Sequence, residues 1–487
     1  MFLTKIQAYD AGQQVVDTFY GLNRAEKIQE GEFSDELNMT SDRFPMLSVR
    51  KKRSVVMNVT GYIVSMLAKD KLYVVWVDTS ASIPDYPNLR LCELIRKDDD
   101  SWTTLKSWTF DKTQTVVKSA VSFGAYIIIP GLDVWYNTAD SNSSTNNGTI
   151  TDMPEMDFVI ECNNRLWGCK YGMVDGETIN EIYASELGDF TSWDNYDGTS
   201  MASYAASVGT DGPWTGAISY QGRPHFFKEK YVHKVYISAT GAHQIVETPI
   251  LGVQENCQFS LAALNGVLYY MSRDGVCAYD GSTPTVISKA LGDLLVEYAF
   301  FGGCSGKLYA LIDEIGTSGT TPRLYTYDVR RGIWHQENNE FGLSAAFAAL
   351  GDSFYICNAA LGLFTPGGSA PTVVLRDENG VDGTKEGDVL YSCTTGLIGW
   401  QNVEQKYVSR FDMRLTLPEG ATMKVEIEYD SSGTWEEQGT VTGGGTGSIM
   451  IPVKPRRCDH FRIRLSGKGE MRMFSFAKRL LKGSDVV

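Results

Sequence analysis

The stretch Asn265-Gly266-Val267-Leu268-Tyr269-Tyr270 indicates the fold of this chain. An asparagine and a glycine, which favour a tight turn, lead into a short strand rich in leucine and tyrosine. Related phrases, each a small polar or glycine residue before such a strand, begin near residues 70, 124, 164, 222, 306 and 351. Spacings of 40 to 58 residues between successive phrases indicate a repeated unit.

A second strand follows the first in most units, for example Leu324-Tyr325-Thr326-Tyr327-Asp328. One small sheet cannot bury both of its faces, whereas several sheets stacked around an axis can, and they leave only short edges. A period of about 40–50 residues is therefore typical of a β-propeller. The expected fold class is all-β with a propeller of about six to eight blades. A β-sandwich with long insertions is the alternative.

Changes in composition and residue pattern along the chain predict four regions. They are an extended N-terminal arm (residues 1–55), the β-propeller (56–375), a linker (376–390) and a β-sandwich (391–487). The first region lacks strand rhythm, and the third is polar and glycine-rich. In the fourth, Phe461-Arg462-Ile463-Arg464-Leu465 alternates apolar and charged residues, which is typical of an antiparallel sheet with one solvated face.

Composition excludes several classes of protein. The 487 residues are 43% hydrophobic and carry a formal charge of −15, so the chain can bury a core and a nucleic-acid-binding surface over the whole protein is disfavoured. No apolar run approaches the ~18 residues of a membrane span. The N-terminus has no apolar region of a secretory signal, which favours synthesis in a cytosol.

The sequence assigns no catalytic, cofactor or metal residue, and the chain is expected not to be an enzyme. Nine cysteines are scattered without a CxxC pair, and five histidines lack metal-ligand spacing. Nucleophile-elbow, phosphate-loop and HExxH motifs are missing. A glycoside hydrolase uses two carboxylates that lie close together in space but need not be close in sequence. The sequence does not exclude such a pair, so this possibility stays open.

Two basic clusters are candidate assembly contacts. Residues 454–482 hold ten Lys or Arg and two acids, a charge of +8 that leaves −23 for the rest of the chain. Such asymmetry predicts contact between copies or with an acidic neighbour; a solvated face and contact with passing DNA are the alternatives. The candidate contacts are Arg50, Lys51, Lys52, Arg53, Arg456, Arg457, Arg462 and Arg464.

Scattered phrases resemble structural proteins of tailed-bacteriophage tails. The N-terminal ones are Gly21-Leu22-Asn23, Asp35, Asn38-Met39, Pro45-Met46-Leu47 and the run from Arg50 to Arg53. Residues 164–167, 182–185 and 188–193 together are similar to a propeller blade of the same family, with Phe190 where that family usually has proline. Pro455-Arg456-Arg457-Cys458-Asp459-His460, before an alternating strand, is similar to the end of such proteins.

The resemblance implies a nozzle, hub or connector ring around the DNA channel of the virion tail, without chemistry of its own. It implies a homo-oligomer, with a hexamer favoured, that contacts other tail or connector proteins during DNA ejection. An acidic net charge suits a channel through which DNA passes without specific binding. Two other interpretations stay open: an adhesin that binds host glycans, with Trp400 and Trp435 stacking on sugars, and a glycoside hydrolase on a propeller.

Overall fold

The structure is a computed structural model. It describes residues 10–58, 61–78, 89–98, 101–111, 118–237, 242–315, 322–338, 347–351, 353–357, 372–376, 384–399 and 405–482. These residues form strands and two short 3-10 helices, η1 (Gln258–Ser260) and η2 (Ser288–Leu291), which confirms the all-β class. Across the described ranges, no helix has the length and apolar character that a bilayer crossing requires.

Six four-stranded antiparallel sheets follow one another between residues 61 and 337 of the described chain. The first three comprise β7 (Gly61–Ala68), β8 (Leu72–Asp78), β9 (Leu89–Lys97), β10 (Trp102–Asp111), β11 (Val121–Phe123), β12 (Tyr126–Ile129), β13 (Val134–Asn137), β14 (Asn147–Thr149), β15 (Phe158–Glu161), β16 (Leu166–Val174), β17 (Glu177–Ala184) and β18 (Tyr204–Ser207). The next three comprise β19 (Gly216–Tyr220), β20 (Arg223–Lys228), β21 (Tyr231–Ile237), β22 (His243–Pro249), β23 (Ala262–Leu264), β24 (Val267–Ser272), β25 (Gly275–Tyr279), β26 (Thr285–Val286), β27 (Val296–Cys304), β28 (Lys307–Glu314), β29 (Arg323–Asp328) and β30 (Ile333–Glu337).

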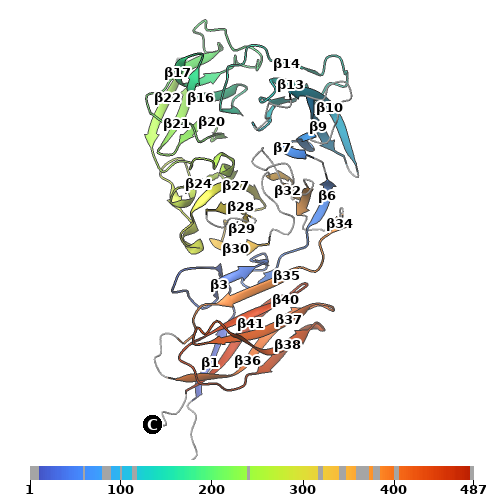
Figure 1. The fold of residues 1–487 in the computed structure, drawn as a ribbon, viewed down its shortest axis with the longest axis vertical. Coiled ribbons are helices and arrows are strands. Elements are labelled where there is room, and N and C mark those ends of the chain that lie inside the picture. Colours follow the sequence, from blue (N-terminus) through green and yellow to red (C-terminus); the bar gives the residue numbers. More distant parts are fainter. Residues whose placement is uncertain are drawn as a thin grey trace, which may run out of the picture.

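A further sheet joins the two ends of this region. It contains β31 (Phe347–Leu350), β32 (Ser353–Cys357), β33 (Thr372–Arg376), β6 (Ser54–Asn58) and β34 (Thr384–Lys385). Because β6 precedes the six four-stranded sheets in the chain and pairs with β33, which follows them, backbone hydrogen bonds close the circle of sheets. The first strands of several successive sheets contact one another, and β31 contacts β7. Figure 1 shows the sheets around a common centre, an arrangement that is propeller-like.

The recurring sequence phrase marks the same turn in several sheets. Asn265 and Gly266 join β23 to β24 with φ angles of 52° and 80°, and Ser305 and Gly306 join β27 to β28 with 49° and 78°. Positive φ at both turn residues matches the twist of a tight hairpin, and glycine adopts it without strain. The strand that follows is buried on both faces, since the successive side chains of Leu268 and Tyr269, which point to opposite faces, are 0% and 3% exposed.

Two six-stranded sheets below the propeller-like region form a second body, here called the platform (Figure 1). One sheet has β39 (Gly445–Pro452), β36 (Lys406–Leu417), β41 (Arg472–Lys482), β5 (Leu47–Val49), β4 (Met39–Thr40) and, paired to β41, β1 (Asp10–Val16). The other has β2 (Gly21–Leu22), β3 (Glu32–Leu37), β35 (Leu390–Thr395), β40 (Phe461–Lys468), β37 (Thr422–Tyr429) and β38 (Trp435–Thr442). Both sheets contribute to one apolar core, which includes Phe411, Ile427 and Ile463.

The N-terminal region is built into the platform. Residues 10–49, predicted as part of an extended arm, instead supply β1 to β5, because Phe19 and Phe33 are buried in the platform core. The chain then crosses to the propeller at residues 50–53 and returns after β34. Of the predicted linker, residues 377–383 lie outside the described residues, and 384–390 hold β34 and the return crossing. The propeller-like region is therefore inserted between two halves of the platform.

Candidate functional site

The first predicted basic cluster lies where the chain leaves the platform. β5 ends at Val49 and β6 begins at Ser54, so the cluster is the crossing itself. Arg50 and Arg53 are only 1% and 0% exposed. A buried guanidinium is stable only when carboxylates and other acceptors surround it, so the partners of these two arginines define the junction.

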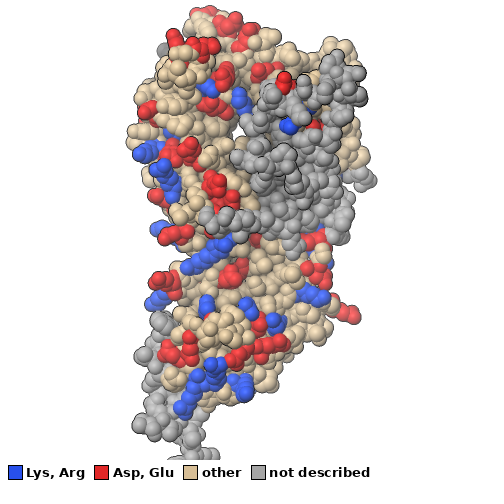
Figure 2. All heavy atoms as spheres, in the orientation of Figure 1, with Lys and Arg blue, Asp and Glu red and all other residues tan. Residues whose placement is uncertain are grey.

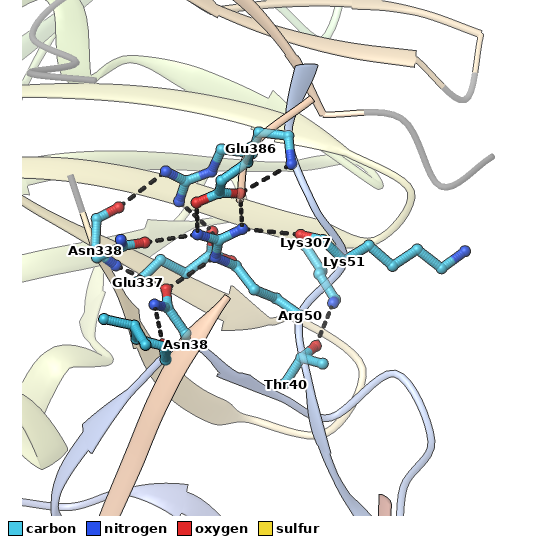
Figure 3. A network of polar contacts seen from close by, with 10 residues as sticks. Asn38, Thr40, Arg50, Lys51, Lys307, Glu337, Asn338 and Glu386 are labelled. Atoms are coloured by element: carbon cyan, nitrogen blue, oxygen red, sulfur yellow. Dashed lines mark hydrogen bonds and ion pairs between the residues drawn. The ribbon is translucent and has the colours of Figure 1, made fainter. Parts of the chain in front are cut away.

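Arg50 is held by side chains from three parts of the chain (Figure 3). Its two terminal nitrogens donate to the two carboxylate oxygens of Glu386, at 2.8 and 2.6 Å. Its Nε donates to Oδ1 of Asn38 at 2.8 Å, and one Nη donates to Oδ1 of Asn338 at 2.6 Å. A two-pronged pair with a carboxylate fixes the guanidinium in both position and orientation.

Arg53 completes the network. Its guanidinium donates to Glu337 Oε2 at 2.8 Å and to the carbonyl oxygen of Asn338 at 2.9 Å. Its backbone N–H donates to the carboxylate of Glu386 at 3.0 Å, and the N–H of Glu386 donates back to the Arg53 carbonyl at 2.8 Å. The outgoing and returning crossings are therefore bonded to each other, with two arginines balanced by two glutamates.

The electrostatics of the junction favour ionised Glu386. Burial opposes the charged form, but the hydrogen bonds and charge of Arg50, together with the Arg53 N–H and charge, outweigh it. The pKa of Glu386 therefore lies below its usual value. Because the charges compensate one another within the network, they are tolerated at a site from which water is excluded.

Asn38 links both bodies through one side chain. Its Nδ2 donates to the carbonyl of Leu390 in the platform at 2.6 Å, while its backbone N–H donates to Gln336 of the propeller at 2.8 Å. Its φ of 59° is left-handed, a conformation that asparagine tolerates better than most residues. The Oδ1 atom accepts from both Arg50 and the N–H of Asn338. A larger or apolar residue would leave several of these groups unsatisfied.

Gly21 brings the platform and propeller backbones together beside this network. Its φ is +71°, and an added Cβ would lie 2.4 Å from the carbonyl oxygen of Trp334 and 2.5 Å from a methyl carbon of Ile333. Close by, buried Glu36 bonds to His335, and Ser41 donates to Asp328 at 2.8 Å. The edge strand β30 and the end of β29 are thus held against the N-terminal segment.

The structure places the first four candidate contacts in two groups. Arg50 and Arg53 are enclosed within their own chain, which corrects the prediction that they contact another copy: the carboxylates of Glu337 and Glu386 bind them. Lys51 and Lys52 are exposed beside them, and Lys52 Nζ lies 3.1 Å from Asp388. Sequence alone did not identify Glu386 as a partner, because it is 336 positions away from Arg50.

The other four candidates lie on or beside the outer face of the second platform sheet. The Nε atoms of Arg462 and Arg464 donate to Glu428 at 2.7 Å and Glu426 at 2.9 Å, and both guanidinium groups lie over the ring of Trp435. In the loop before β40, Arg456 pairs with Glu436, and Arg457 is exposed next to it. Acids of the same chain therefore neutralise most of this cluster, and it does not meet the first one.

A cavity of about 860 Å³ lies between the first strands of several propeller sheets, among them β11, β15, β19 and β27. Glu155, Asp157, Glu161 and Glu297 line it. Lys170 lies 2.7 Å from Glu155 and 3.1 Å from Asp157. The hydrogen bond and charge of Lys170 lower the pKa of Glu155, which disfavours a proton-donating role for this acid. In the described part of the chain, no three His, Cys, Asp or Glu side chains are grouped to hold a metal ion.

Comparison with known proteins gives no family. No family model matches the chain. No curated protein matches it either. The similar solved structures include AztD from Citrobacter koseri, 10% identical, covering 85% of this chain and 96% of that one with a TM-score of 0.37. An exo-β-1,3-galactanase from Phanerochaete chrysosporium is 10% identical and covers 87% and 100%, with a TM-score of 0.25. These scores are too low to carry any argument about function.

Lowering the pH should test the ionic character of the junction. Since the folded-state pKa of Glu386 is below its ordinary 4.5, its ionised form adds stability above that pH, and this is lost as pH falls through the folded pKa. We expect Glu386→Gln to lower the free energy of unfolding near pH 7, and the difference from wild type to shrink between about pH 5 and pH 3. Urea denaturation of both proteins across this range measures it. A constant difference would contradict an ionic contribution.

Proposed function

We propose that this chain is a non-enzymatic structural component of a bacteriophage tail, a nozzle, hub or connector that forms a ring with copies of itself. One observation carries the proposal. The N-terminal residues that resemble phage tail proteins, among them Gly21, Asn38, Arg50 and Arg53, are the residues that join the propeller-like region to the platform. The residues that carry the resemblance are therefore residues of the junction between the two bodies.

The form of the junction supports a structural role in which the two bodies keep a fixed orientation. Two chain crossings are bonded to each other, and a buried ionic network, two paired backbones and several single hydrogen bonds fix the propeller edge on the platform. A part that holds neighbouring components in register needs such a fixed angle between its bodies. A receptor-binding head on a tether does not.

We further propose the finer fold that goes with this function. The seven described propeller sheets are the seven blades of one propeller, closed by the pairing of β6 with β33. The two platform sheets, with one shared core, are a β-sandwich. Each body is then a complete rigid unit, and the junction sets their mutual orientation.

Mass photometry and negative-stain images of the purified full chain test the proposed function. We expect closed particles of one symmetry, a hexamer being favoured by the resemblance, and no hydrolysis of polysaccharides. The same sample should leave a glycan array unlabelled. Particles that stay monomeric at every concentration, together with specific glycan binding, would contradict the proposal.

Glycan binding is the second candidate function, and the carboxylate-lined cavity among the first propeller strands favours it. The face of Trp435 is less suitable for stacking on a sugar, because Arg464 lies 4.3 Å from its ring centre. Trp400 lies outside the described residues. Substituting Asp157 and Glu297 by the corresponding amides would abolish glycan binding if this cavity were the site.

A further inference from the structure

An acidic projection stands out on the third propeller sheet. Between residues 171 and 222 the sequence has eight Asp or Glu and no Lys or Arg. Residues 186–201, here called the knob, follow the end of β17 and contain four of these acids. Figure 2 shows acidic side chains crowded at the end of the propeller farthest from the platform.

Hydrogen bonds close the base of the knob, and apolar side chains lie among its acids. Buried Arg165 donates to the carbonyl oxygens of Ser185, Ser200 and Ala202 at 2.5 to 2.7 Å, which closes the base of the knob. Its exposed apolar residues are Leu187, Tyr196 and Met201, at 41%, 57% and 56% exposure. The N–H of Leu187 donates to the carbonyl of Met201 at 2.9 Å, so these two lie together. Exposed apolar groups on a preorganised loop mark a protein-binding surface.

A surface of opposite character lies on the platform. We call the outer side of the sheet formed by β39, β36, β41 and β1 the basic face. Four arginines and one aspartate point outward from its strands: Arg410, Arg414, Arg472, Arg479 and Asp412. Inward-pointing neighbours such as Phe411 and Met413 fill the core instead, which fixes this alternation.

The basic face also has an apolar depression. One row across the sheet reads Met450, Asp412, Ala477 and Val15, since these residues pair in register. Met450 and Val15 at the two ends are 56% and 55% exposed, whereas Ala477 between them is buried. The resulting hollow measures about 330 Å³, and its lining includes Ser448, Ser475 and Ala477 as well as the oppositely charged Asp412 and Arg414. It offers room for an apolar side chain between Met450 and Val15, with Arg414 and Asp412 at its border.

We propose that the knob of one copy docks on the basic face of a second copy, with its apolar residues in the hollow and its acids opposite the arginines. The two surfaces are opposite in charge, and each has exposed apolar groups; specific protein contacts combine these two features. A nucleic acid fits the basic face less well, because exposed Met450 and Val15 border its centre and the chain as a whole is acidic.

The positions of the two surfaces require two copies. β17, from which the knob extends, and the platform lie at opposite ends of the molecule (Figure 1). One chain cannot join its own knob to its own basic face, so the contact joins two copies, either reciprocally in a pair or head-to-tail along a series of copies. A head-to-tail contact closes a ring when its rotation is commensurate with a circle and otherwise extends as a chain. The knob and the basic face would thus supply the contact by which copies assemble in the proposed function. The biological role of the docking therefore rests on the proposed function.

A charge exchange between the surfaces tests the docking. Asp194→Lys changes an exposed acid of the knob, Arg414→Glu changes an exposed arginine of the basic face, and the two are combined in a third variant. Lys468→Glu, exposed on the other platform sheet, is the control with the same change of charge as Arg414→Glu. Sedimentation velocity of the full chain up to about 100 µM, at low and moderate salt, measures self-association.

We expect each single variant to weaken association roughly fivefold or more, the combined variant to regain most of it, and the control to match wild type. Met201→Ser, which removes the exposed apolar side chain without adding a charge, should weaken association and should not be rescued by Arg414→Glu. The docking would be overturned if the knob and face variants associated as strongly as wild type. It would also be overturned if wild type did not associate at any concentration. Open chains of copies in which the charge variants weaken association and the combined variant restores it would support the docking and contradict the ring. Closed rings that the charge variants do not affect would support the ring and contradict the docking.

Discussion

Replacing Arg50 by leucine is expected to lower the free energy of unfolding by about 3–5 kcal/mol. The guanidinium makes bonds to Glu386, Asn38 and Asn338, and all of them are lost. The larger cost is electrostatic: the Glu386 carboxylate, whose side chain is only 3% exposed, would remain in the junction without its two-pronged partner. Guanidinium chloride denaturation of the full chain measures the change.

Lys52→Met is the matched control for Arg50→Leu. Lys52 lies two residues away and also pairs with an acid of the return crossing, Asp388, but the two side chains are 43% and 50% exposed. Solvent screens such a pair, so we expect a loss of about 0–1 kcal/mol. The double variant Arg50→Leu/Glu386→Leu removes both charges and should be less destabilised than Arg50→Leu alone. Equal losses for Arg50→Leu and Lys52→Met would refute the role given to the buried network.

Gly21→Ala should also be strongly destabilising, by about 2–5 kcal/mol. The left-handed φ of +71° costs any residue with a Cβ, and here the new atom would also overlap the carbonyl oxygen of Trp334 at 2.4 Å. That oxygen belongs to the backbone of β30, so relief requires β2 to move away from the propeller edge. Chemical denaturation measures the loss, and faster proteolysis at the junction should accompany it.

Gly266→Ala separates the two contributions to this effect. Gly266 has a similar φ of +80° in a hairpin turn, but nothing lies within 4 Å of the position that an added Cβ would take. Only the backbone strain of about 1–2 kcal/mol should then appear. If the two alanine variants were equally stable, close approach of the two bodies at Gly21 would not be the cause.

The regular parts of the fold were predictable from sequence because they depend on local physics. The turn-and-strand phrase around Asn265 and Gly266 specifies a tight hairpin in several sheets, and the alternation in Phe461–Lys468 specifies a sheet with one buried face. Both patterns need only neighbours in the chain. The all-β class and its propeller-like repeat follow from them.

The junction was not predictable in the same way. Arg50 to Arg53 have the composition of a solvated basic patch, and only the return of Glu386 from 336 positions away makes Arg50 a buried ionic partner. Residues 10–49 lack strand rhythm because their strands are short and irregular, yet Phe33 still fills the platform core. Long-range pairing, which leaves no mark on local spacing, decided these elements. The basic face was not predictable for the same reason, since its arginines come from two strands far apart in sequence.

The insertion of one body within the other has a consequence for how the protein is made. β6 ends at Asn58 and β33, its partner, begins at Thr372. At roughly 5–20 residues per second, a ribosome needs roughly 16–60 s to travel between them. Throughout that time β1 and β3 lack β41 and β35, the strands with which they pair, because those strands have not yet been synthesised. The earliest part of the nascent chain is therefore among the last to reach its folded place, and a ribosome that stalls before the return crossing releases apolar strands whose partners were never synthesised.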